Sequence, residues 1–323
     1  MKHIDTIFVI ALTRLEGVGV KTVMRVCEAA KELCFEFTSA KDLYKFLAYA
    51  RNRKLVARLR EVGESDVDKA FVEAKRIIEE SNAKGIYALS YLDTDYPKEL
   101  LKTLDENGNA AAPVLIYYKG DISITHQPGI AVIGTREPTS EGERLGMWMA
   151  EMFARQGFNI ISGLALGCDT CGHRGALTVK GKTTAVLAHG LTTIYPPQNE
   201  QLAAEIVESG GLLLSEYPIG TRLTTYNLVA RDRLQSGLAK ATLVVQTGKS
   251  GGTMHAVRST IASQKPLYVV KYHDAATLTH EKTAGNEYLA QSYAKFISET
   301  DDVAEIAAKI KSAEPIKTNL FDF

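Results

Sequence analysis

The chain has 323 residues, a formal net charge of zero, 45% hydrophobic and 24% charged residues, and four cysteines. This length usually means two domains, and the neutral charge excludes attraction of a polyanion by the molecule as a whole, so an anionic partner must meet a local basic patch. We expect no signal peptide, no membrane span and no disulfide framework, which indicates a cytoplasmic protein.

Residues 1–84 are predicted to form a helical domain. Apolar residues recur at helical spacing near the N-terminus, and Gly17-Val18-Gly19 interrupts this pattern before a second helix over 21–30. Such a pair is typical of a helix-hairpin-helix or SAM-like unit, whose turn can offer N–H groups to a DNA phosphate. An ordinary helix pair with a glycine turn gives the same pattern. Further helices are predicted over 40–47, 54–62 and 66–81.

Residues 85–311 alternate short apolar runs with helical segments. This alternation predicts an α/β domain with an extended Rossmann-like, doubly wound and mostly parallel sheet. Strands are predicted over 86–89, 114–117, 130–133, 159–161, 184–187, 212–214, 241–246, 267–270 and 295–297. Late helices are predicted over 227–237, 252–263 and 300–311, the last capped by Thr300. Residues 312–323 are predicted to form a flexible C-terminal tail.

Two predicted strands end in glycine turns that precede helices. Gly134-Thr135-Arg136 follows the strand over 130–133, and Ser162-Gly163 follows the strand over 159–161. Glycine allows a tight turn, and N–H groups, hydroxyls and a guanidinium all suit phosphate. The turns therefore predict an anion site. The sequence lacks the G-x-G-x-x-G fingerprint of dinucleotide sites, so we expect no NAD or FAD.

A third turn of this kind is Lys249-Ser250-Gly251-Gly252, which lies between the strand over 241–246 and the following helix. Adjacent glycines with a lysine and hydroxyls are typical of an anion nest, although a tight crossover turn also uses glycines. The turn lacks the remaining residues of a nucleotide-hydrolysing P-loop. Nucleotide hydrolysis is therefore not predicted at this turn. For the chain as a whole we expect no cofactor, no metal and no catalytic residue.

Basic residues are concentrated between residues 210 and 271, where eight lysines and arginines stand against two acids. The cluster includes Arg231 and Arg233. In a neutral chain this local excess favours a polyanionic partner, and a solvated charged face is the alternative.

The segment from Cys168 to His173 contains two cysteines, an aspartate and a histidine. The other two cysteines lie in the helical N-terminal region, so a four-ligand zinc site is not predicted. We expect Cys168 and Cys171 to be buried small residues. Asp169 and His173 are four residues apart on one helix face, and we expect them to bond each other and orient the turn.

Taken together, these segments resemble the DNA-processing protein A family, called DprA or Smf. The resemblance covers roughly residues 85–310, and the N-terminal LEGVGVKTVMRV is similar to the helical leader of that family. The matching motifs are, in order, GTREPTSEGE, GFNIISGLALGCDTCGHRGAL, TTAVLAHGLTTIYPPQN, GGLLLSEYPIGT, RDRLQSGLAKATLVVQ, KSGGT and GNEYLAQSYAKFISETDDV.

The resemblance implies a protein that is not an enzyme and that binds single-stranded DNA on a Rossmann-like domain. It also implies protection of incoming DNA in natural transformation, loading of RecA and a homodimer. Arg136, Ser162, Gly163, Lys249, Ser250 and Gly251 would line a phosphate pocket, with Arg231 and Arg233 beside it. Gly134, Thr135, Lys182 and Gly252 complete the predicted site.

Three residues depart from the family pattern. Leu166 stands where the family usually has an arginine, Leu228 replaces an aromatic residue and Asp232 replaces an asparagine. Loss of a stacking ring costs about 1–3 kcal/mol of base stacking, and Tyr226 is a candidate substitute. We expect no C-terminal winged-helix domain.

Two other functions are compatible with the same pattern. The changes at Leu166 and Leu228 favour a sensor of a nucleotide-derived small molecule, of the phage-defence type. A lonely-guy-type nucleotide phosphoribohydrolase is less favoured, because Met254-His255-Ala256 supplies no acid after the glycine turn.

The C-terminal Leu320-Phe321-Asp322-Phe323 resembles peptides that dock DNA-replication proteins into the sliding clamp, without their usual glutamine. We expect the tail to act as a peptide ligand for such a partner, or to carry no partner at all.

Overall fold

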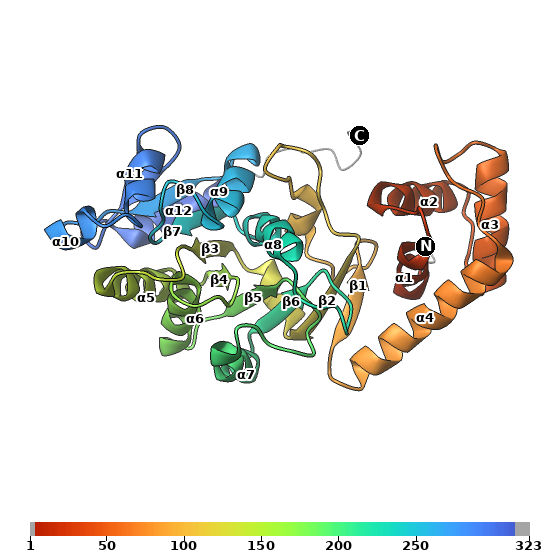
Figure 1. The fold of residues 1–323 in the computed structure, drawn as a ribbon, viewed down its shortest axis with the longest axis horizontal. Coiled ribbons are helices and arrows are strands. Elements are labelled where there is room, and N and C mark those ends of the chain that lie inside the picture. The colour runs from red at the N-terminus through yellow and green to blue at the C-terminus, as the bar shows by residue number, and fades with distance from the viewer. Residues whose placement is uncertain (1–3, 314–323) are drawn as a thin grey trace. The chain divides into compact units, whose positions relative to one another are not determined.

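The computed structural model describes residues 4–313, so the predicted tail motif at Leu320–Phe323 lies outside the described residues. The chain forms two compact units (Figure 1). The first comprises Met1–Tyr96 with Pro113–Tyr117, and the second comprises Pro97–Ala112 with Tyr118–Phe323. The first unit thus extends beyond residue 84, where the sequence analysis places the boundary. No helix within residues 4–313 is long and apolar enough to cross a membrane.

The first unit is mainly helical, as predicted. It contains α1 (Thr6–Arg14), α2 (Val20–Glu32), α3 (Ala40–Asn52), α4 (Glu64–Asn82) and the short strand β1 (Tyr87–Ser90). Phe8 and Phe46 are buried in a cluster with three further phenylalanine rings. Gly17, with a φ of 76°, turns the chain between α1 and α2, and this left-handed conformation suits glycine.

The helix predicted over 54–62 is wrong. Lys54 and Arg58 have φ angles of 55° and 61°, which a right-handed helix cannot contain. The segment buries only Val56 and Leu59. Because so few of its side chains reach the core, packing does not favour a regular helix there.

The second unit contains a parallel sheet, which confirms the predicted α/β fold class. Its strands are β3 (Gly129–Ile133), β4 (Asn159–Ser162), β5 (Thr183–Leu187), β6 (Leu212–Ser215), β7 (Ala241–Val244), β8 (Leu267–Val270) and β9 (Lys295–Ile297). They lie in the order β6-β5-β4-β3-β7-β8-β9, and every neighbouring pair is parallel. Strand β2 (Leu115–Gly120) contains residues of both units.

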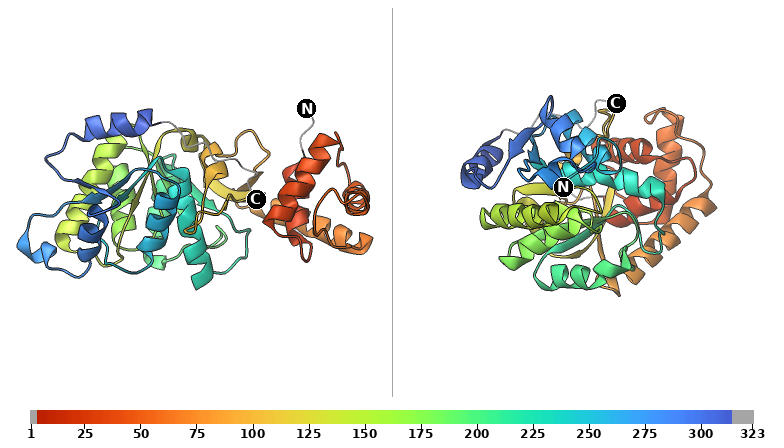
Figure 2. Two further views of the ribbon diagram at one scale, coloured as in Figure 1. Left: turned by 90° about the horizontal axis from the view of Figure 1, so that it is seen from above. Right: turned by 60° about the vertical axis from the view of Figure 1, so that its left-hand side comes forward.

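Helices cover both faces of this sheet (Figure 2). Helix α5 (Ser140–Arg155) packs on α6 (Cys168–Thr178) and on α12 (Val303–Ser312), and α6 also contacts α7 (Glu200–Glu208). Helices α8 (Thr225–Leu238) and α9 (Thr253–Ala262) form a separate pair. The central strands are completely buried because they lie between these layers.

Some short elements were not predicted. They are the helices α10 (Ala275–Leu278) and α11 (Ala284–Ala290) and the 3-10 helices η2 (Ile122–His126) and η3 (Pro197–Asn199). The 3-10 helix η1 (Lys98–Lys102) is the short helical piece predicted between the strands over 86–89 and 114–117. The predicted cap of the last helix is wrong as well. Asp302, not Thr300, caps α12, because its carboxylate accepts hydrogen bonds from the N–H groups of Ala304 at 2.9 Å and Glu305 at 3.1 Å.

The strand order reverses its direction between β3 and β7. From β3 the chain moves through β4 and β5 to β6, whereas β7 lies on the other side of β3 and leads to β8 and β9. The loops after β3 and β7 therefore run to helices on opposite faces and leave a crevice at the carboxyl ends of these strands. In open α/β sheets, ligands bind at such a switch point.

Candidate functional site

A groove lies at this switch point, and we call it the central groove. Its walls are the turn after β3 (Gly134–Arg136), the turn after β7 (residues 248–253) and the first two turns of α8. Its volume is about 620 Å³, which is typical of a site that holds a nucleotide-sized ligand. The sequence analysis predicts two of these walls from their glycine turns.

The turn after β3 is anchored by Gln246. The Thr135 N–H donates to the Gln246 carbonyl at 2.7 Å, and the Gln246 side-chain oxygen accepts from the Thr139 N–H at 2.8 Å. The Arg136 side chain, in contrast, is exposed and lines the groove. No acid within residues 4–313 pairs with the Arg136 side chain, so its charge is available to a ligand.

The turn after β4 is held from within by Asp169. Its carboxylate accepts hydrogen bonds from the N–H groups of Gly163 at 3.0 Å and Ala165 at 3.3 Å. Ser162 is fully buried and donates to the Val132 carbonyl at 2.6 Å. The Ser162 hydroxyl and the Gly163 N–H were predicted to contact phosphate. Both instead make hydrogen bonds within the protein, beneath the groove.

Asp169 orients the turn, as predicted, but without His173. The His173 Nδ1 atom lies 2.7 Å from the Thr183 hydroxyl, so the predicted Asp169–His173 hydrogen bond is wrong. Burial lowers the pKa of His173 to about 3, with a smaller effect from Arg231, and the ring is therefore neutral. Its role is to tie α6 to β5.

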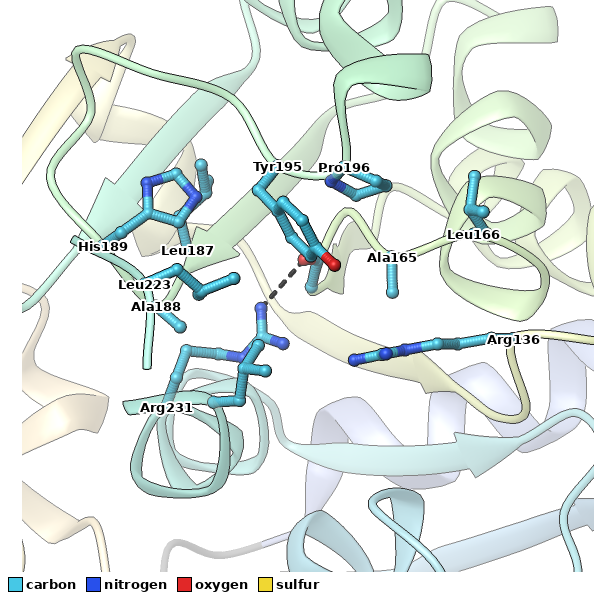
Figure 3. Close-up of a pocket in the computed structure, with 12 residues that line it drawn as sticks. Arg136, Ala165, Leu166, Leu187, Ala188, His189, Tyr195, Pro196, Leu223 and Arg231 are labelled. Carbon is cyan, nitrogen blue, oxygen red and sulfur yellow. Dashed lines mark hydrogen bonds between the residues drawn. The ribbon is translucent and has the colours of Figure 1, made fainter. Parts of the chain in front are cut away.

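Arg231 is a buried residue beneath the groove, with only 5% of its surface exposed. Its guanidinium donates to the Gly163 carbonyl at 2.9 Å, to the Val186 carbonyl, and to Asp232 at 3.1 Å. It thereby links the carboxyl ends of β4 and β5 to α8. One edge of Arg231 still lines the groove, where it faces Arg136 (Figure 3).

Two buried carboxylates accompany Arg231. Burial raises the pKa of Asp232 to about 6, although the charge of Arg231 opposes the shift. Burial also raises the pKa of Asp169, again against Arg231. Both carboxylates line the central groove, so they lower its positive charge as long as they are ionised.

Arg233 and Lys182 are predicted site residues that do not line the central groove. Arg233 forms an ion pair with Glu216, in which one guanidinium nitrogen lies 2.8 and 2.7 Å from the two carboxylate oxygens, and its Nε donates to the Ala111 carbonyl at 3.0 Å. Lys182 precedes β5, at the opposite edge of the sheet, where its ammonium donates to the Ser209 carbonyl at 3.2 Å. Both side chains therefore already bond groups within the protein.

The turn after β7 contributes Ser250, Gly251 and Gly252 to the central groove, as predicted. Gly251 has a φ of 123°, which favours glycine, and α9 begins directly afterwards at Thr253. N–H groups at a helix start suit an anion. Lys249 is exposed and lines a neighbouring groove instead. Lys282 also lines the central groove, and no sequence pattern indicated it.

An apolar pocket adjoins the central groove, and Figure 3 shows the side chains that line it. Tyr195, Leu166 and Leu223 form its apolar walls, and Arg136 and Arg231 are shared with the central groove. His189 also lines the pocket, and burial lowers its pKa, which favours the uncharged ring at neutral pH. The combination of apolar walls and adjacent guanidinium groups suits a nucleobase joined to a phosphate. No sequence pattern indicated Tyr195 or His189 as site residues.

The cysteines of α6 are buried, as predicted. Burial raises the pKa of Cys171 to about 11 and also raises the pKa of Cys168 well above its usual value, so both are protonated thiols at neutral pH. Among residues 4–313 no cluster of three metal-ligating side chains is present.

Comparison with known proteins identifies relatives of this chain. Residues 87–308 match the family model described as DNA recombination-mediator protein A. Protein Smf of Synechocystis is 37% identical over 55% of this chain and 44% of its own length, and Protein Smf of Escherichia coli is 32% identical over 65% and 54%. The chain thus spans about half the length of these two relatives.

Solved structures show the same fold. DNA processing protein A from Streptococcus pneumoniae superimposes with a TM-score of 0.74 and 23% identity, covering 95% of this chain and 98% of that one. A structure that describes the single-stranded DNA binding mode of the Helicobacter pylori protein has a TM-score of 0.58 and 26% identity, covering 70% and 95%.

Proposed function

This chain belongs to the DNA recombination-mediator protein A family, and we propose that it binds single-stranded DNA with phosphates in the central groove. The family consists of DNA-binding proteins without catalytic activity, in agreement with the prediction that this chain is not an enzyme. The Helicobacter pylori relative is described as binding single-stranded DNA, which favours the same ligand here.

The observation that carries the proposal is that Arg136, which has no acidic partner among residues 4–313, lines the same groove as the Ser250–Gly252 turn. The residues lie at one edge of the sheet but come from loops more than 100 positions apart in the sequence. Phosphate oxygens accept hydrogen bonds both from a guanidinium and from backbone N–H groups. Arg231 contributes positive charge from below, and its hydrogen bonds fix the shape of the groove.

Bases are expected to contact the apolar side chains around the groove. Leu228 and Leu166 replace the aromatic and basic residues of the family pattern and provide apolar contact only. Tyr195 and Tyr226 are 47% and 79% exposed, so their rings are accessible for stacking. Stacking on exposed rings gives affinity without base preference.

Further family properties belong to the same proposal. We infer a cytoplasmic homodimer that protects incoming DNA and assists RecA loading. Support for these points comes from family membership. Sedimentation analysis of the full chain with and without RecA tests them.

Binding is tested with a fluorescent oligothymidine and a duplex of equal length, titrated at several salt concentrations. We expect preference for the single strand and an affinity that falls steeply with salt, because phosphate contacts release counterions. Arg136→Ala with Lys282→Ala, which removes two basic side chains that line the central groove, is expected to weaken binding at least tenfold. Arg155→Ala, which removes an exposed arginine paired with Glu151 at 2.7 Å, serves as the control. An affinity of the double variant within about twofold of the parent chain at equal salt would refute the groove assignment.

A second candidate is a nucleotide-derived small molecule. The apolar pocket with Tyr195 and Leu223 has a volume of only about 70 Å³ and adjoins the central groove at Arg136 and Arg231, so a nucleotide with its base against the pocket would extend into the central groove. A ligand that binds only the folded state raises the melting temperature. A thermal shift with mononucleotides but not with oligothymidine would favour this candidate.

A further inference from the structure

A second groove lies on the opposite side of helix α9, and we call it the outer groove. Its walls are the loop at residues 106–108, the outer side of α9 and the tyrosines Tyr288 and Tyr293. We propose that a single strand leaving the central groove continues into the outer groove, where these tyrosines stack on its bases. This inference rests on the proposed function and extends the path of the same ligand.

The two grooves share one wall. Ser250, Gly251 and Gly252 line the central groove, whereas the preceding Lys249 lines the outer groove. On α9 the same division appears, since Ala256 faces the central groove and Arg258 faces the outer one. A helix with its side chains is about 10–12 Å across. A strand that passes around the start of α9 therefore connects the grooves within a few nucleotides.

Tyr288 and Tyr293 provide two stacking surfaces. They are 42% and 52% exposed, and their ring centroids are 6.5 Å apart at an angle of 55°. The rings do not lie parallel, so each can take a separate base. Exposed aromatic rings beside basic residues are typical of grooves that bind single strands without sequence preference.

The charge of the outer groove suits a phosphate backbone. Lys249 and Arg258 line it, and Glu106 is the only acid among its described lining residues. The Glu106 carboxylate lies 2.9 Å from the His255 Nδ1 atom and 3.1 Å from an Arg258 nitrogen. Because Glu106 is held by α9, it fixes the loop as a wall, while Lys249 has no acidic partner among the described residues.

The loop at 106–108 is itself rigidly built. The Asp105 carboxylate accepts hydrogen bonds from the N–H groups of Asn107 and Asn109, both at 2.9 Å, and Leu104 bridges to Ala110. The Leu104 carbonyl also accepts from the Ser259 hydroxyl of α9 at 2.7 Å. The outer groove is thus a formed feature of the second unit, available before any ligand binds.

The test compares oligothymidines of about 5 and about 15 nucleotides, a range that spans one and several stacking contacts. Binding is measured by fluorescence anisotropy with the full chain, the Tyr288→Ala/Tyr293→Ala variant and the Tyr288→Phe/Tyr293→Phe variant. We expect the alanine variant to lose at least about fivefold in affinity for the long strand. Affinity for the short strand should stay unchanged, and the phenylalanine variant should bind like the parent chain, because its rings remain.

Tyr49→Ala is the matched control, since Tyr49 is 44% exposed and lies in the first unit. Equal loss for short and long strands, or no loss for either, overturns the inference and leaves the proposed function intact. Failure of the parent chain to bind any oligothymidine overturns both. A change from dimer to monomer in the alanine variant, seen by sedimentation, assigns this surface to a second copy of the chain and also overturns it.

Discussion

The guanidinium of Arg231 lies directly against the backbone of Gly163 and donates a 2.9 Å hydrogen bond to its carbonyl. A Cβ atom at position 163 would overlap that guanidinium, so the turn after β4 requires glycine. The turn at Gly163 was predicted to contact phosphate. In the structure, its glycine instead leaves space for the Arg231 side chain. The Arg231 guanidinium therefore places a positive charge at the carboxyl ends of β4 and β5 in the ligand-free protein.

Replacing Arg231 is expected to destabilise the fold. Arg231→Ala removes two carbonyl contacts and leaves Asp169 and Asp232 buried without their cation. Breaking a buried ion pair from one side typically costs about 3–5 kcal/mol. Urea unfolding should show this loss in the free energy of unfolding. Arg155→Ala removes an exposed pair and should change it by less than about 1 kcal/mol.

Gly163→Ala probes the same contact from the backbone side. The added methyl must displace Arg231, so we expect a loss of about 1–3 kcal/mol in the free energy of unfolding, as for overpacking of a core. Gly157→Ala is not a suitable control because its φ of 77° adds strain. Gly19→Ala is suitable, since no atom lies within 4 Å of the added carbon and its φ is −84°. Equal stability of the two variants would contradict the role of Gly163.

The strands could be predicted from the sequence because each is a short run of residues buried on both faces. Ile130–Ile133 and Leu212–Leu214 show this pattern without help from distant residues. The helix predicted over 54–62 failed because its mixed charges allow several local structures, and only Val56 and Leu59 reach the core. Helix α11 was missed for the opposite reason, since a buried Asn286 that bonds the Val245 and Val270 carbonyls holds it in place.

The residues of the site likewise divide into those fixed by local sequence and those fixed by distant contacts. The glycine turns around Arg136 and Ser250 are local features, and the structure places them together. The partners of Arg233 and Lys182 cannot be inferred from nearby residues, because Glu216 and Ser209 reach them through the tertiary fold. Tyr195 was missed because it belongs to a loop whose path over the sheet depends on distant contacts.

The pH dependence of stability provides a test of Asp232. Its pKa is raised from 3.8 to about 6, chiefly by burial. The folded state then holds a proton more tightly than the unfolded state. The resulting stabilisation is complete below about pH 4 and is lost as the pH rises through about 6. Asp232→Asn keeps an oxygen for Arg231 and removes this titration, so its melting temperature should fall less than that of the parent chain between pH 4 and 7. Parallel curves would refute the assignment.

Restoring the family's basic residue should strengthen DNA binding. Leu166 is 39% exposed and lines the apolar pocket beside Arg136. Leu166→Arg adds one cation there, and each phosphate contact to a single strand adds about 0.7 to the slope of log affinity against log salt. Leu278→Arg adds the same charge at a side chain that is 42% exposed and lines neither groove. We expect the steeper slope in the Leu166 variant only. A similar gain in both variants would mean that net charge, not the groove, attracts the strand.

Substitutions at Arg136 and Arg233 should have different effects, one on DNA binding and the other on the free energy of unfolding. Arg136 has an exposed side chain without an acidic partner in the described part of the chain, whereas Arg233 is held by Glu216 at 2.7 Å and by the Ala111 carbonyl. Arg136→Ala is therefore expected to lower the salt slope by about 0.7 and to leave the free energy of unfolding within about 0.5 kcal/mol. Arg233→Ala should do the reverse, with an unchanged slope and a loss of about 1–3 kcal/mol, because it leaves Glu216 half-buried and unpaired. Oligothymidine titrations at several salt concentrations and urea unfolding of both variants measure the two quantities. If Arg233→Ala lowers the slope while the protein remains folded, Arg233 contacts the phosphates and the ion pair with Glu216 opens when DNA binds.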